Sequence, residues 1–107
     1  MGGKTMSEKI YTIEEIKKVL EELLKDKPVY KVILFGSYAK QKATKKSDVD
    51  LIIDTNSQLK GFALLKLIYE IEEKLQKKID GFEKYEIQEN SLIDKEIRET
   101  GVVVYEK

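Results

Sequence analysis

The chain has 107 residues, with 20 Lys and Arg against 20 Asp and Glu, and it contains neither Cys nor His. A domain of this size can bury a hydrophobic core, whereas the missing thiols and imidazoles exclude disulfides, Cys and His zinc sites, cysteine nucleophiles and Ser-His-Asp triads. The remaining oxygen ligands suit a hard metal ion such as Mg²⁺. Zero net charge argues against nucleic-acid or membrane binding through bulk charge. Since no apolar run could span a membrane, we expect a cytoplasmic protein.

The first third of the chain predicts a tail, a helix and a strand. Residues 1–9 have no apolar pattern and should form a flexible tail. Thr12 and Glu15 match the capping-box pattern, and apolar residues then recur at helical spacing until Pro28 ends the helix. Residues 29–35 are β-branched and aromatic, which predicts a buried strand.

The long helix expected over about 59–76 has an unusual distribution of apolar residues. A second strand is expected at 49–54, before this helix. The N-terminal half of the helix is apolar nearly all round. One face of a sheet cannot cover such a helix, so it is either covered on two sides or faces a partner protein.

The C-terminal part predicts two further strands, at 78–85 and 102–105, around a short helix that Asn90 or Ser91 caps. That helix should run to Thr100 and turn three side chains inward, namely those of Leu92, Ile93 and Ile97. Alternating helices and strands predict an α/β or α+β fold with a small sheet flanked by helices, in one domain over residues 10–107.

A Gly-Ser turn and a pair of aspartates stand out as candidate functional residues. Gly36 and Ser37 follow a predicted strand and precede a brief helix, where a phosphate can approach the backbone and amide groups favour an anion. Asp48 and Asp50 stand two residues apart on the next strand, so both carboxylates project from one face. A cation between them would relieve their repulsion.

Asp80 is the candidate for a third carboxylate. The helix before it should return the chain beside the strand that carries the aspartate pair, although a solvated strand end is the simple alternative. Three carboxylates around metal ions can activate an attacking oxygen and neutralise a leaving pyrophosphate. Residues 40–46 add lysines without an acid, either as a solvated loop or as phosphate contacts.

The order Gly36-Ser37, ten residues, Asp48-Val49-Asp50 resembles the signature of the polymerase-β-type nucleotidyltransferase superfamily. Residues 35–51 are most similar to the minimal nucleotidyltransferases (MNT domains), which are the antitoxins of HEPN/MNT toxin–antitoxin pairs, and the likeness extends from about Ile10 to Glu106. The resemblance implies a polymerase-β-like fold with a small mixed sheet. It also implies an enzyme that needs Mg²⁺ and ATP and transfers AMP to a tyrosine of a HEPN ribonuclease toxin, which silences that toxin.

The resemblance also assigns roles to individual residues. It implies that three aspartates are catalytic and bind metal, and that four residues bind the nucleotide: Asp48, Asp50 and Asp80 for the first group, and Gly36, Ser37, Lys40 and Ser47 for the second. The family usually has Arg and Gly where this chain has Lys40 and Gln41, and an apolar residue where it has Gly81.

Other readings stay open beside this one. The chain could mask a toxin by contact alone, or transfer a nucleotide to a small molecule. Tyr38 and Tyr85 could stack on a nucleotide base. The expected partners are ATP and a HEPN-domain protein in a hetero-oligomer, with no membrane and no direct nucleic-acid contact.

Overall fold

The computed structural model describes residues 9–107, so the expected tail lies outside the described residues except for Lys9. Its centre is a mixed sheet with the strand order β3-β2-β1-β4. The strands are β1 (Lys31–Phe35), β2 (Val49–Asp54), β3 (Ile79–Glu83) and β4 (Val102–Glu106). β1 pairs antiparallel with β2 and β4, whereas β2 and β3 are parallel. The mixed α+β architecture predicted from the sequence is confirmed.

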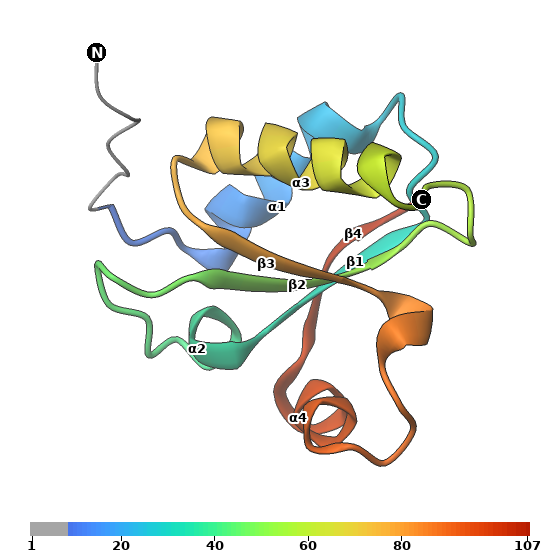
Figure 1. Ribbon diagram of the computed structural model, residues 1–107. Helices are drawn as coiled ribbons and strands as arrows, with labels where there is room; N and C mark the ends of the chain where they lie inside the picture. The colour runs from blue at the N-terminus through green and yellow to red at the C-terminus, as the bar shows by residue number, and fades with distance from the viewer. Residues whose placement is uncertain (1–8) are drawn as a thin grey trace.

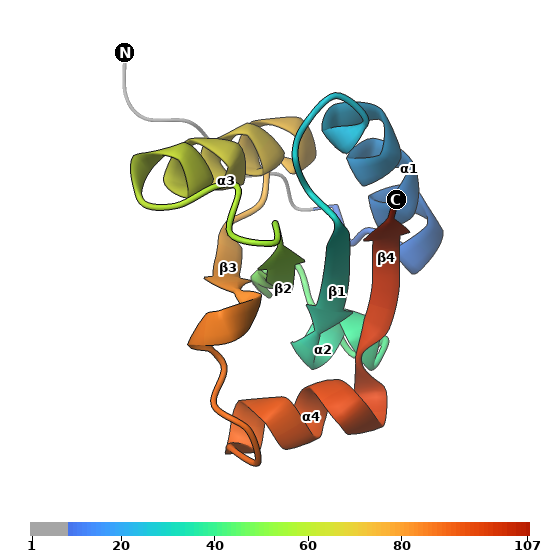
Figure 2. The same cartoon turned by 90° about the vertical axis from the view of Figure 1, so that its right-hand side faces the viewer.

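Helices lie on both sides of this sheet. α1 (Ile13–Leu24) and α3 (Phe62–Leu75) lie side by side on one side, and α2 (Gly36–Ala39) and α4 (Leu92–Thr100) lie on the other (Figures 1 and 2). A 3₁₀ turn, η1 (Lys84–Glu86), follows β3. α3 connects the parallel strands β2 and β3, as a parallel pair requires a crossover.

The capping box at the start of α1 is confirmed. Thr12 Oγ1 accepts a hydrogen bond from the backbone N–H of Glu15 at 3.1 Å, and Glu15 Oε1 accepts one from the N–H of Thr12 at 2.9 Å. These bonds satisfy amides that have no partner within the helix. α1 ends at Leu24, before Pro28.

The hydrophobic core fills the space between the sheet and the α1–α3 layer. Its fully buried members come from both helices and from the two central strands, and they include Ile16, Leu20, Leu24, Leu34, Leu51, Ile53, Leu67, Ile71 and Leu75. Gly81 brings α3 close to β3, because a Cβ at this position would lie 2.8 Å from Ile68 Cδ1. No helix in the described part is long and apolar enough to cross a membrane.

Several element ends differ from the sequence-based expectation. α3 begins at Phe62, not at 59, because the preceding turn contains Asn56, Ser57 and Gly61 with positive φ. β1 begins two residues later than expected, and β3 ends at Glu83, immediately before η1.

The inward orientation expected for Leu92 is wrong. Its side chain is 85% exposed, whereas those of Ile93 and Ile97 are partly buried. Consecutive residues of a helix are rotated by about 100°, so Leu92 lies off the stripe that Ile93 begins. Ser91, not Asn90, caps this helix: its Oγ accepts the N–H of Asp94 at 3.2 Å.

Candidate active site

Asp50 and Asp80 meet on one face of the sheet. They are register partners in the parallel β2–β3 pair, and partners in a sheet project their side chains to the same side. Asp48 precedes β2 and stands two residues before Asp50, so it lies toward the same face. The structure thus places Asp80 beside Asp50, on the strand next to the one that Asp48 precedes.

The electrostatics of Asp50 reflect this crowding. Burial, together with the nearby carboxylates of Asp80, Asp48 and Glu96, raises the pKa of Asp50 to about 6. Burial and the neighbouring negative charges each disfavour the ionised form of the Asp50 carboxyl group. A cation beside Asp50 would relieve the same repulsion that a proton relieves.

The donor atoms here fit a hard divalent ion, because they are carboxylate oxygens. In the described part of the chain, however, no three carboxylates stand close enough together to form a metal-binding group. Asp50 and Asp80 are the close pair, and Asp48 contributes through its charge.

Gly36 packs directly against Asp50. Phe35, at the end of β1, is the register partner of Asp50, so the Gly-Ser turn emerges beside it. Gly36 has φ +74°, and a Cβ there would overlap Asp50 Oδ2. A side chain at this position is therefore disfavoured twice, by backbone conformation and by contact. Ser37 follows in α2, half-buried.

Lys40 reaches α4 through an ion pair. Its Nζ lies 3.3 Å from Glu96 Oε2. Sequence reasoning missed Glu96 as a residue near the site. The sequence does contain a signal for Glu96: it lies next to Ile97 and three residues after Ile93. This spacing places Glu96 toward the sheet-facing side of the helix.

Several hydrogen bonds hold the loop that leads to Asp48, and two of them involve the side chains of Ser47 and Lys77. Ser47 Oγ accepts the N–H of Thr44 at 2.8 Å, and the buried Lys77 donates from Nζ to the carbonyl of Lys45 at 2.9 Å. The hydroxyl of Ser47 therefore has a structural partner, and its role toward a nucleotide stays a prediction. Lys77 was also missed, since one lysine in a charged sequence carries no distinctive pattern.

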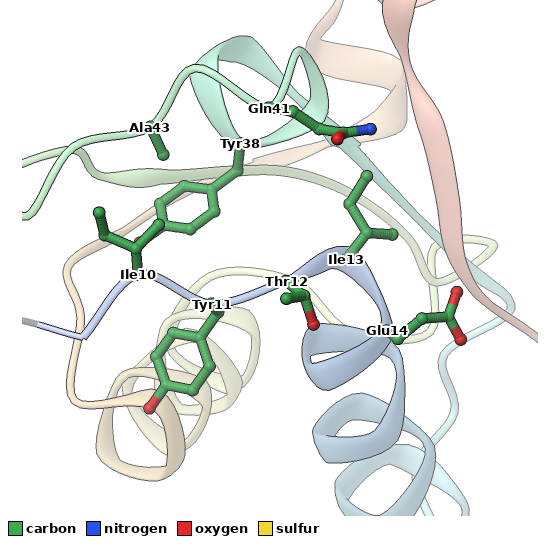
Figure 3. A pocket seen from close by; sticks show the side chains of 8 residues that line it. All are labelled: Ile10, Tyr11, Thr12, Ile13, Glu14, Tyr38, Gln41 and Ala43. Atoms are coloured by element: carbon green, nitrogen blue, oxygen red, sulfur yellow. The ribbon is translucent and has the colours of Figure 1, made fainter.

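Tyr38 does not face the site. Its side chain is only 2% exposed and packs near the start of α1, so the expectation that it stacks on a base is wrong. A hollow of about 450 Å³ lies here between the segment that leads into α1 and the residues after α2 (Figure 3). Its lining includes Ile10, Ile13 and Gln41, but none of the aspartates.

Comparison with known proteins gives the family. The family model described as a nucleotidyltransferase domain matches residues 13–103. This chain belongs to the nucleotidyltransferase domain family. Its relatives include a protein of Methanocaldococcus jannaschii with the provisional name protein adenylyltransferase, 36% identical over 99 residues, which cover 87% of this chain and 98% of the relative. A second such protein from this organism is 35% identical over 97 residues, covering 87% and 98%.

Solved structures share the nucleotidyltransferase fold at low sequence identity. A toxin–antitoxin structure with AMP-PNP has a TM-score of 0.68 at 18% identity and covers 91% of this chain and 75% of that chain. A complex of a tri-AMPylated HEPN toxin of Shewanella oneidensis with its MNT antitoxin has a TM-score of 0.66 at 16% identity, with 90% and 74% covered. These likenesses confirm the nucleotidyltransferase fold that the sequence predicted.

Proposed function

We propose that this nucleotidyltransferase transfers AMP from ATP to a tyrosine of a HEPN-type ribonuclease toxin and thereby neutralises it. The relatives that bear the name protein adenylyltransferase support a protein acceptor. The AMPylated toxin and the AMP-PNP complex among the structural neighbours support the toxin and the adenine nucleotide. Such an antitoxin would act in the cytoplasm, where its toxin attacks RNA.

The observation that carries the proposal is that β2, β3 and the turn after β1 meet at Asp50. β3 brings Asp80 into register with Asp50, and the turn after β1 brings Gly36 against the Asp50 carboxylate. A structural scaffold gains no stability from like charges held together in a partly buried place. Nucleotidyl transfer uses this arrangement, because it needs carboxylates next to a backbone that a phosphate can approach.

The chain's own residues have distinct tasks in this reaction. Asp50 and Asp80, with Asp48 beside them, would hold Mg²⁺, which supplies positive charge to the triphosphate. Gly36 leaves room for the phosphates, and Ser37 and Lys40 offer a hydroxyl and an ammonium donor. The tyrosine oxygen attacks the α-phosphorus and pyrophosphate leaves. The phenolic proton passes to a carboxylate of the site, for which Asp80 is the candidate.

The test combines the purified chain, MgCl₂, ATP labelled at the α-phosphate and the product of the adjacent gene. Label should appear on that protein with wild type and disappear with Asp48→Asn. Asp54→Asn is the matched control, because it makes the same change at the other end of β2, where the carboxylate pairs with Lys84 at 3.6 Å. Toxin neutralisation that survives Asp48→Asn combined with Asp80→Asn would refute the enzymatic mechanism.

Masking of the toxin by contact alone is the second candidate, and one observation favours it. Phe62, Leu65 and Tyr69 form a stripe on the outer side of α3 and are 89%, 41% and 57% exposed. Their spacing of three and four residues places them on one face of the helix. No described residue covers this stripe, which favours the alternative of a helix that faces a partner protein. A toxin bound there would be masked without chemistry, and the double Asp variant distinguishes the two mechanisms.

A further inference from the structure

The ion pair of Lys40 and Glu96 joins α2 to α4 beside the candidate site. Both side chains are partly exposed, and their charged atoms are 3.3 Å apart. Lys40 follows α2, four residues after Gly36. Glu96 lies near enough to Asp50 for its charge to act on that carboxylate. Lys40 therefore pairs with an acidic residue of α4 from a position one helical turn after the glycine of the Gly-Ser turn.

The ammonium group of Lys40 can bind either the carboxylate of Glu96 or a phosphate of the nucleotide. Lysine carries a compact point charge, without the two-pronged geometry with which arginine can bind a carboxylate and a phosphate side by side. Glu96 also adds negative charge to a site that already contains three aspartates. A triphosphate must therefore draw Lys40 away from Glu96, and a partly exposed ion pair is weak enough to be exchanged.

We propose that Glu96 sets the nucleotide affinity of the site by competing with the triphosphate for the ammonium group of Lys40. The inference rests on the proposed function only in taking a nucleoside triphosphate as the ligand. Glu96 is a positioning residue, since it acts through Lys40. When the phosphates take its place, the link between α2 and α4 opens.

The test is a double-mutant cycle on ATP affinity, measured by calorimetry on the full chain with MgCl₂ and no acceptor protein. Glu96→Gln should tighten ATP binding by about two- to fivefold, the range expected from release of one exposed ion pair. Lys40→Met should weaken binding. In the Lys40→Met background, Glu96→Gln should change the affinity little, because the group for which it competes is gone.

Glu99→Gln is the matched control. It makes the same charge change at an exposed position of α4 and should leave the affinity unchanged. Glu96→Asp keeps the charge and should bind ATP more weakly than Glu96→Gln. The melting temperature of each variant shows that it is folded.

Two results would overturn the inference. Equal tightening by Glu96→Gln with and without Lys40 would mean that Glu96 acts only through its charge on the whole site. Weaker or unchanged binding would mean that it does not compete. Failure of the proposed function looks different: wild type would bind ATP, the cycle would hold, and no label would reach the partner protein.

Discussion

The Cα of Gly36 lies so close to the carboxylate of Asp50 that a methyl group on it would overlap Asp50 Oδ2. The turn after β1 and the first acidic residue of β2 therefore constrain each other. A change at one of them must displace the other.

Gly36→Ala should abolish nucleotide binding and lower the free energy of unfolding by about 2 kcal/mol or more, because strain at φ +74° adds to the overlap with Asp50. Gly61→Ala separates the two effects: φ is +55° there, but nothing lies within 4 Å of the added Cβ. It should cost only the backbone strain, about 1–3 kcal/mol, and leave ATP binding intact. Urea unfolding and calorimetry measure both quantities, and equal losses in the two variants would contradict the contact.

Asp50→Asn should stabilise the chain at neutral pH in EDTA. The pKa of Asp50 is raised from 3.8 to about 6 in the folded state, so the folded chain holds this proton more tightly than the unfolded chain. The stability from the protonated form is complete below the ordinary pKa and is lost as pH rises through about 6. The melting temperature of the variant should thus exceed that of wild type above pH 6 and approach it near pH 4.

Asp26→Asn, an exposed position after α1, controls for the loss of one charge. Mg²⁺ should raise the melting temperature of wild type more than that of Asp50→Asn. A difference between wild type and Asp50→Asn that does not depend on pH would show that Asp50 titrates normally.

Glu83→Ala should destabilise the fold by about 2 kcal/mol or more, because it removes the acceptor of several buried donors. Glu83 is buried at the end of β3, and its carboxylate accepts the hydroxyl of Thr55 at 3.2 Å and the N–H of Glu86. Glu89→Ala, at an exposed position, should change stability by less than about 0.5 kcal/mol. Thermal unfolding compares them, and similar melting temperatures would show that Thr55 finds another partner.

Phe62→Asp should weaken association with the partner protein and leave the fold unchanged. Its side chain is 89% exposed, so the free chain gains little from it, whereas an interface would bury it. Leu92→Asp makes a comparable change at the 85% exposed position on α4, away from the stripe on α3. Calorimetric titration with the partner should show a loss for Phe62→Asp and not for Leu92→Asp. Equal affinities for both variants and wild type would place the interface elsewhere.

The arrangement of the aspartates in the candidate site could be predicted from the sequence because it depends on local rules. Alternation along a strand places Asp48 and Asp50 on one face, and the crossover helix returns Asp80 beside them. The contributions of Glu96 and Lys77 could not be predicted in this way. They depend on how α4 and the residues after α3 pack against α2 and the loop that follows it. Long-range packing of this kind leaves no periodic pattern in a charged sequence. The burial of Tyr38 has the same origin, because the segment before α1 covers it.

Gly81, next to Asp80 on β3, has a consequence for the opposite side of the sheet. Ile68 of α3 occupies the space that a side chain at this position would fill. A larger residue at 81 would push α3 outward, and Phe62, Leu65 and Tyr69 would move with it. The distance between this stripe and the acidic residues is thus fixed by the lack of a side chain at position 81. A variant with a larger residue there would keep the acidic residues in place and still shift the exposed apolar stripe.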